Sequence, residues 1–137
     1  MIGEPKTLES LKDGMFSKKM LGNGYAIVPT KGYIYSPVAG EITVASDTKH
    51  SYGIKEIGTK NEYLIHIGFN TVELDGVGFV SHVKQGELVE AGQLIGEVKL
   101  KLLKKMNIDT TTMIIATSGK VPIKPKSHTN IVAIERE

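Results

Sequence analysis

The chain contains no cysteine and no tryptophan, and its other aromatic residues are only 5 Tyr and 3 Phe. Without cysteine it forms no disulfide and offers no thiolate for catalysis or metal binding. So few aromatic side chains leave little for stacking on nucleic-acid bases. No apolar run approaches the ~20 residues of a membrane-spanning helix, and residues 1–6 lack the apolar core of a signal peptide. These absences favour a cytoplasmic protein that neither crosses a membrane nor binds nucleic acid.

The charge balance is close to neutral, because 17 basic residues face 15 acidic residues and leave a formal net charge of +2. Such a small excess does not indicate binding to nucleic acid or to an anionic membrane. A length of 137 residues fits one domain. We expect a flexible N-terminal segment over residues 1–16 and a single folded domain over residues 17–137.

Glycine is abundant, with 15 residues, and turn signals divide the chain into short segments from about residue 22 onward. Strands are expected between these turns, at residues 25–29, 33–36, 40–45, 52–57, 62–67, 78–83, 93–98, 111–116, 120–123 and 130–135. The lysine- and leucine-rich stretch 99–107 is a candidate for a short helix. Many short strands at regular spacing predict an all-β fold, an antiparallel sandwich or barrel with one or two short helical turns.

Two histidines lie 16 residues apart at the edges of strand-like segments, His50 in 47–50 and His66 in 63–68. Because the chain has neither cysteine nor a glycine-rich phosphate loop, imidazole is the best nucleophile available for covalent chemistry. A histidine in an apolar run is more often an interior residue that needs hydrogen bonds at both ring nitrogens. The spacing alone therefore favours a structural role. His82 and His128 have no comparable support, and we assign neither a role.

The wider sequence resembles the glucose-type enzyme IIA domain of the bacterial phosphoenolpyruvate-dependent sugar phosphotransferase system. The segments that carry the resemblance are 19–27, 35–42, 48–50, 64–68, 70–74, 76–79 and 83–96. The resemblance implies an antiparallel β-sandwich with a shallow, largely apolar depression that holds two histidines. It implies that His66 carries phosphate on Nε2, that His50 hydrogen-bonds to this phosphate, and that Thr48 supports His50.

The same resemblance implies a phosphoryl carrier for sugar uptake, that is, a phosphotransferase component without a metal or cofactor. The donor would be the histidine phosphocarrier protein, and the acceptor would be the cysteine of a sugar-specific enzyme IIB. We expect the carrier to be a monomer. From the residues themselves, a carbonyl of Gly68 is placed to accept a hydrogen bond from Nδ1 of His66, which would leave Nε2 as the nucleophile.

Three positions depart from the family pattern. Asn23 and Asn70 stand where the family has Asp, and both belong, with Gly68, to the expected partner-binding rim. Asparagine keeps the size and the hydrogen bonds of Asp but loses the charge, so we expect slower association with a basic donor. One extra residue between the two histidines falls in the turn at 58–61, where an insertion costs little.

Three alternatives remain open from the sequence. Two histidines with an Asp or Glu can bind zinc, as in lysostaphin-type endopeptidases of related β architecture. That class needs a His-x-His pair, which is absent here, and two histidines leave a catalytic zinc site one ligand short. A biotinyl- or lipoyl-type carrier would need a modifiable lysine at a hairpin tip, a requirement that Lys49 fits poorly. The third alternative is a regulatory binding module of the same fold with weakened phosphotransfer.

Overall fold

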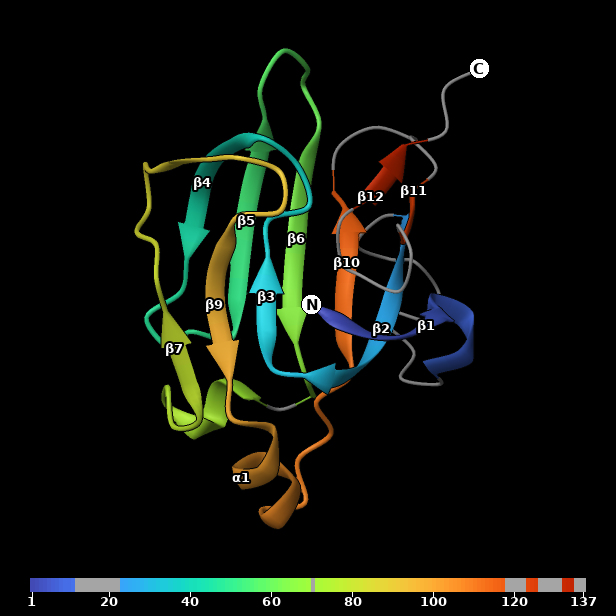
Figure 1. The fold of residues 1–137 in the computed structure, drawn as a ribbon, viewed down its shortest axis with the longest axis vertical. Coiled ribbons are helices and arrows are strands. Elements are labelled where there is room, and N and C mark those ends of the chain that lie inside the picture. Colours follow the sequence, from blue (N-terminus) through green and yellow to red (C-terminus); the bar gives the residue numbers. More distant parts are fainter. Residues whose placement is uncertain (12–22, 70, 118–122, 126–131, 135–137) are drawn as a thin grey trace.

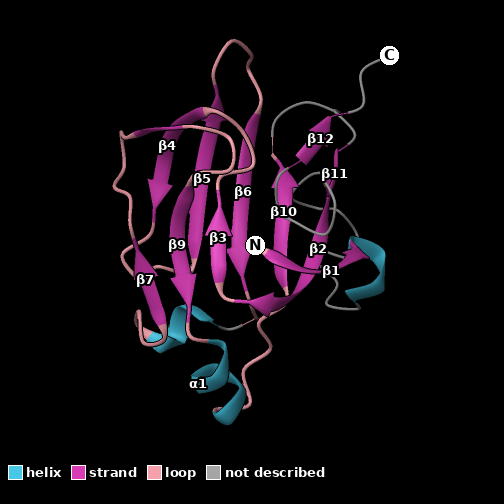
Figure 2. Ribbon diagram, viewed as in Figure 1, coloured by secondary structure: helices cyan, strands magenta, loops and turns pink. Residues whose placement is uncertain are grey.

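The computed structural model describes residues 1–11, 23–69, 71–117, 123–125 and 132–134. The strands are β1 (Ile2–Thr7), β2 (Asn23–Lys31), β3 (Tyr33–Tyr35), β4 (Gly40–Ala45), β5 (Ser51–Glu56), β6 (Glu62–Ile67), β7 (Phe79–Ser81), β8 (Leu88–Val89), β9 (Leu94–Val98), β10 (Thr112–Ala116), β11 (Ile123–Pro125) and β12 (Val132–Ile134). The helical segments are the 3-10 helices η1 (Leu8–Leu11) and η2 (Thr71–Leu74) and the α-helix α1 (Leu100–Lys105). Strands dominate the ribbon in Figure 2.

The strands form two layers, as Figure 1 shows. A seven-stranded antiparallel sheet has the order β1-β2-β10-β6-β5-β4-β8, and a three-stranded sheet, β3-β9-β7, lies across it. Strands β11 and β12 pair only with each other among the described residues. The predicted all-β antiparallel sandwich is therefore confirmed, and β4 and β6 have the bounds that the sequence predicted.

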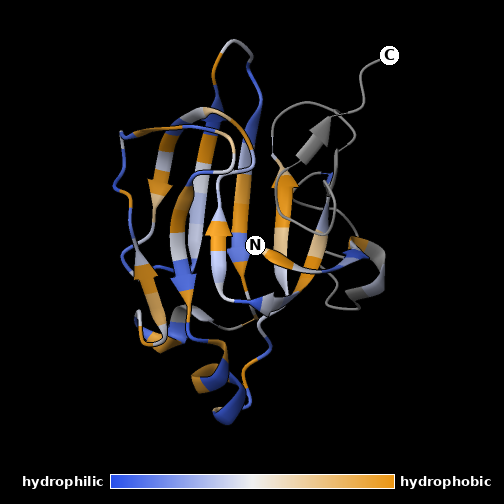
Figure 3. Cartoon of the chain, in the orientation of Figure 1, coloured by the Kyte–Doolittle hydropathy of each residue, from blue (hydrophilic) through white to orange (hydrophobic). Residues whose placement is uncertain are grey.

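The core lies between the two layers and is built from residues of strands β2 to β10. On β6 the alternation of a strand puts Tyr63, Ile65 and Ile67 into the core, while Leu64 and His66 point to the opposite face. Figure 3 shows the apolar residues concentrated on the strands. Full burial of an isoleucine side chain contributes about 1.5–3 kcal/mol. This repeated contribution fixes the register of β6, because a shift by one residue would bury His66 instead.

The first residues differ from the expectation of a flexible segment over 1–16. Ile2–Thr7 form β1, which pairs antiparallel with β2, and Met1 and Leu8 at its two ends are fully buried. The sequence did not predict this strand, because its outward residues are polar and because it contains Pro5, which is tolerated on an edge strand. The two-residue edge strand β8 was also not predicted.

The helix expected within 99–107 is confirmed as α1. Leu103 is its buried residue, and the lysines of its last turn are exposed. Among the described residues no helix has the length and apolar character required to cross a membrane.

Candidate functional site

Strands β5 and β6 bring the two histidines together. Ser51, the first residue of β5, lies opposite His66 in the ladder, so His50 stands next to it at the end of β6. The backbone N–H of Ile67 donates to the carbonyl of His50 at 2.8 Å. The ring centroids of His50 and His66 are 5.1 Å apart, and the rings meet edge to face at 81°.

A tight turn before β5 fixes the ring of His50. Oγ1 of Thr48 lies 2.5 Å from Nδ1 of His50, within hydrogen-bond distance of the ring. Lys49 between them has φ 60, a left-handed conformation that costs energy for a residue with a side chain. The N–H of Lys49 donates to the carbonyl of Ser46 at 2.9 Å, which helps to hold this conformation. Because Nδ1 is engaged, Nε2 of His50 is the nitrogen left for a ligand.

Burial and a backbone contact set the environment of the His66 ring. Its Nδ1 is shielded from solvent, although the residue as a whole is only half-buried. A backbone hydrogen bond with Gly68 raises the pKa of the ring. A carbonyl acceptor has this effect, because it stabilises a protonated nitrogen. Gly68 itself is buried, so it acts through its backbone beneath the ring and offers little surface to a partner.

Both imidazoles are less basic than an ordinary histidine. Burial lowers the pKa of His50. Burial is also the largest cause of the lowered pKa of His66, and the neighbouring His50 lowers it further, while Gly68 works in the opposite direction. A pKa below the usual 6.5 leaves both rings uncharged near pH 7. Each ring therefore has one nitrogen lone pair available for bonding.

The face of the large sheet around His66 is apolar. Met113 on β10 lies directly across from His66, and Ala26 on β2 lies across from Met113. Ala26, Met113 and Ile115 are fully buried in a second apolar cluster, separate from the main core, and the partly buried Phe69 packs against it. The apolar residues on this side of the sheet come from strands β2 and β10, which the sequence did not connect to His66.

Of the three residues expected to form the partner-binding rim, the structure describes Asn23 and Gly68. Asn23 begins β2 opposite Ala116, at the far end of β10 from Thr112, which pairs with Ile67. Asn70 lies outside the described residues. The turn with the extra residue, at 58–61, connects β5 to β6 at the end opposite His66, as Figure 1 shows.

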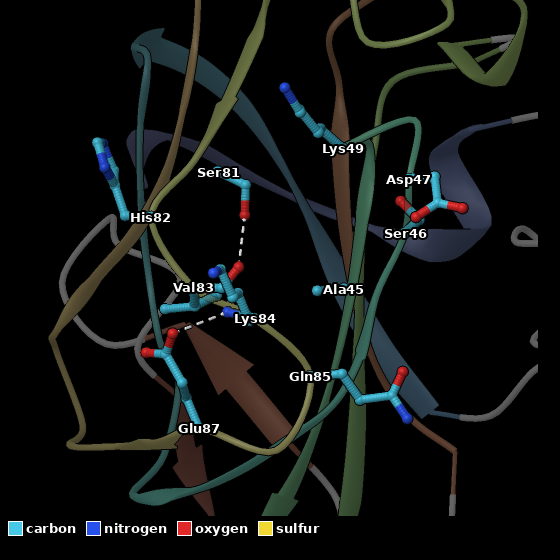
Figure 4. A pocket seen from close by; sticks show the side chains of 10 residues that line it. All are labelled: Ala45, Ser46, Asp47, Lys49, Ser81, His82, Val83, Lys84, Gln85 and Glu87. Carbon is cyan, nitrogen blue, oxygen red and sulfur yellow. Dashed lines mark hydrogen bonds between the residues drawn. The ribbon is translucent and has the colours of Figure 1, made fainter.

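A surface pocket of about 540 Å³ lies beside the His50 turn but does not include either ring. It is lined by Ala45, Ser46, Asp47, Lys49, Ser81, His82, Val83, Lys84, Gln85 and Glu87 (Figure 4). His82 is exposed, and its Nε2 lies 2.6 Å from a carboxylate oxygen of Glu97. This contact explains His82 as part of a surface hydrogen bond with Glu97. His128 lies outside the described residues.

Metal ligands are few around the two rings. Within the part of the chain that the structure describes, no three His, Cys, Asp or Glu side chains come together in a group that could hold a metal ion. The donor set at this site is the two imidazoles.

The fold and the site together define an all-β sandwich with paired, uncharged histidines on an apolar face. Residues 1–121 match the family described as the phosphoenolpyruvate-dependent sugar phosphotransferase system, EIIA 1. The match covers most of the chain, and the chain therefore belongs to this family.

Relatives and a solved structure agree with this assignment. The chain is 42% identical over 111 residues to the PTS system glucose-specific EIIA component of Halalkalibacterium halodurans, which covers 81% of this chain and 64% of that protein. It is 40% identical over 118 residues to the PTS system glucose-specific EIICBA component of Streptococcus pneumoniae serotype 4, covering 85% of this chain but only 16% of that protein. The structure of glucose permease IIA from Mycoplasma capricolum superimposes with a TM-score of 0.79 at 39% identity, over 86% of this chain and 76% of that one.

Sequence reasoning missed Met113 as the cross-strand neighbour of His66, and Ala26 as the residue on the far side of Met113. A run of strand-forming residues is a local signal, and it predicts strands that contain both residues. It does not say which strands pair, so no local pattern connects β10 to β6.

Proposed function

We propose that this protein is a phosphoryl carrier of sugar uptake in which His66 accepts the phosphoryl group on Nε2 and His50 binds it. The observation that carries the proposal is the pair of rings 5.1 Å apart, both with a pKa lowered by burial. A neutral imidazole is a good nucleophile near pH 7. Because Nδ1 of His66 is shielded from solvent, Nε2 is the nitrogen that a donor can reach.

The accepting step forms one bond and breaks one. The lone pair on Nε2 of His66 attacks phosphorus in line with the histidine nitrogen of the donor, and the bond from phosphorus to that nitrogen breaks with its electron pair. The His66 ring then carries positive charge, which the Gly68 hydrogen bond stabilises, as its effect on the pKa indicates. This stabilisation lowers the cost of accepting the group.

His50 binds the transferred group, and Thr48 supports His50. With the Thr48 hydroxyl donating to Nδ1 of His50, the proton of the neutral ring lies on Nε2 and donates to a phosphoryl oxygen. A phosphoryl group bound nearby carries negative charge and raises the pKa of His50, which strengthens this hydrogen bond further. In the onward step a thiolate attacks phosphorus from the opposite side, and the electron pair of the N–P bond returns to Nε2 of His66.

The partners follow from this chemistry and from the relatives. We assign the histidine phosphocarrier protein as donor and the cysteine of an enzyme IIB as acceptor, with both transfers in the cytoplasm. The EIICBA name of the S. pneumoniae relative supports an EIIB domain as acceptor.

The test is phosphorylation by phosphoenolpyruvate, enzyme I and the histidine phosphocarrier protein, followed by intact mass. Wild type is expected to gain one acid-labile phosphoryl group, and His66→Ala none. His50→Ala is expected to accept the group slowly and to fail to pass it on. His82→Ala is the matched control, since it removes an exposed imidazole outside the site, and it should behave as wild type.

Two outcomes of this test would contradict the proposed phosphoryl transfer. A folded wild type that gains no mass, or a His66→Ala variant that still gains it, contradicts the proposal. In the first case zinc binding by wild type, measured by calorimetry, would favour the metal interpretation.

A further inference from the structure

The backbone beside His66 has a shape that depends on a distant turn. Gly68 follows β6 with φ +75, and a Cβ at this position would lie 2.6 Å from the carbonyl oxygen of Asp109 and 2.6 Å from Cγ2 of Thr71. The N–H of Gly68 donates to the carbonyl of Thr111 at 2.9 Å, and the N–H of Phe69 donates to the carbonyl of Asp109 at 3.1 Å. The segment 109–111 therefore fixes the orientation of the Gly68 peptide.

That segment is itself held by one carboxylate. Oδ1 of Asp109 accepts hydrogen bonds from the backbone N–H of Thr111 at 2.9 Å and from its hydroxyl at 2.7 Å. Asp109 is an exposed residue, whereas Thr111 is 8% exposed. The carboxylate thus acts on conformation: it closes the turn that leads into β10 and sets the direction of the carbonyl groups of residues 109 and 111.

The connection continues to the ring of His66. Because Gly68 has no side chain, its hydrogen bond with the His66 ring is made by its backbone. A carbonyl in this place favours a proton on the ring nitrogen that faces it. The direction of that carbonyl follows from the two peptide N–H groups that Asp109 and Thr111 bind.

We propose that Asp109 is a positioning residue for His66, which keeps the Gly68 carbonyl aimed at Nδ1 and so holds the lone pair on Nε2. The chain of contacts runs from the Asp109 carboxylate through the Thr111 turn and the Gly68 peptide to the ring. The inference deepens the proposed function, since Nε2 is the nitrogen assigned to accept the phosphoryl group. Asp109 does not touch the reacting atoms, and its effect is on the choice of tautomer.

The experiment measures the tautomer of His66 by nitrogen NMR of ¹⁵N-histidine-labelled protein at a pH above the pKa of the ring. Wild type is expected to show the proton on Nδ1. In Asp109→Ala the ratio of the two tautomers should shift toward the other form by about two- to ten-fold, as expected for one weakened hydrogen bond. The pKa of His66 should also fall, because the Gly68 bond that raises it is weakened.

Two further variants separate position from charge. Asp109→Asn keeps an acceptor oxygen for Thr111 but removes the negative charge, and it should restore the wild-type tautomer. Glu87→Ala is the matched control, because it removes another exposed carboxylate that accepts from a backbone N–H, that of Lys84 at 3.1 Å. It should leave the tautomer unchanged.

The outcomes decide the proposal without any transfer of phosphate. An unchanged tautomer in Asp109→Ala, an Asp109→Asn variant that behaves like Asp109→Ala, or an equal shift in Glu87→Ala overturns it. The same samples are then tested for phosphoryl acceptance. A shifted tautomer in a protein whose wild type accepts no phosphate would support the positioning role and contradict the proposed function alone.

Discussion

Replacing Gly68 with alanine tests how closely the backbone fits beneath His66. Gly68 has φ +75, and its missing Cβ would meet the carbonyl oxygen of Asp109 and Cγ2 of Thr71, both at 2.6 Å. Thr71 cannot retreat easily, because it is fully buried and its hydroxyl donates to the carbonyl of Ile67 at 2.5 Å. The alanine methyl group therefore displaces backbone on one side and a fixed side chain on the other.

Two costs add in this variant. A left-handed conformation costs an alanine about 1–2 kcal/mol relative to glycine. Forcing a methyl group into filled space costs about 1–3 kcal/mol more. We expect Gly68→Ala to lower the free energy of unfolding by about 2–5 kcal/mol.

Gly58 supplies the control for the first cost alone. It has φ +82, and a Cβ placed there would meet no atom within 4 Å. Gly58→Ala should therefore lose only about 1–2 kcal/mol. The assay is equilibrium urea denaturation of wild type and both variants, with the m-value checked for constancy. Equal losses in the two variants would refute the reasoning, because they would show that the close contacts of Gly68 have no energetic effect.

The other predictions concern stability and charge. Tyr25 is 4% exposed, and its hydroxyl is buried with no hydrogen-bond partner among the described residues, so Tyr25→Phe should raise the free energy of unfolding in urea by about 1 kcal/mol. A loss of stability in that variant would indicate a partner for the hydroxyl. Burial lowers the pKa of His50 and His66 below 6.5, so the unfolded chain binds more protons than the folded chain between the lowered values and 6.5. Stability should therefore fall as the pH drops through this window, and the double variant with Gln at both positions should show a weaker dependence in urea titrations at several pH values; an unaltered slope would contradict the assigned pKa directions. His82→Ala should cost less than about 1 kcal/mol, because the pair with Glu97 is exposed, and a larger loss would show that the pair does more than bridge two surface side chains.

The sequence predicted the strands best where strand-forming residues lie between glycine turns. The bounds of β4 and β6 were obtained from the sequence in this way. Strand β1 was not, since an edge strand with polar outward residues lacks this signal. The pairing of β10 between β2 and β6 was also beyond a local pattern.

For the candidate site, too, some features follow from the sequence and others depend on the tertiary structure. His50, His66 and Thr48 were proposed as site residues from the family resemblance, because the spacing of the two histidines alone favoured a structural role. Their approach to 5.1 Å between rings required β5 and β6 to pair in one register. The sequence by itself therefore determined which residues are available for the chemistry and which strands carry them. Only the tertiary structure decided the lowered pKa of both rings and the fit of Gly68 against Asp109, because desolvation and close contact depend on atoms that are distant along the chain.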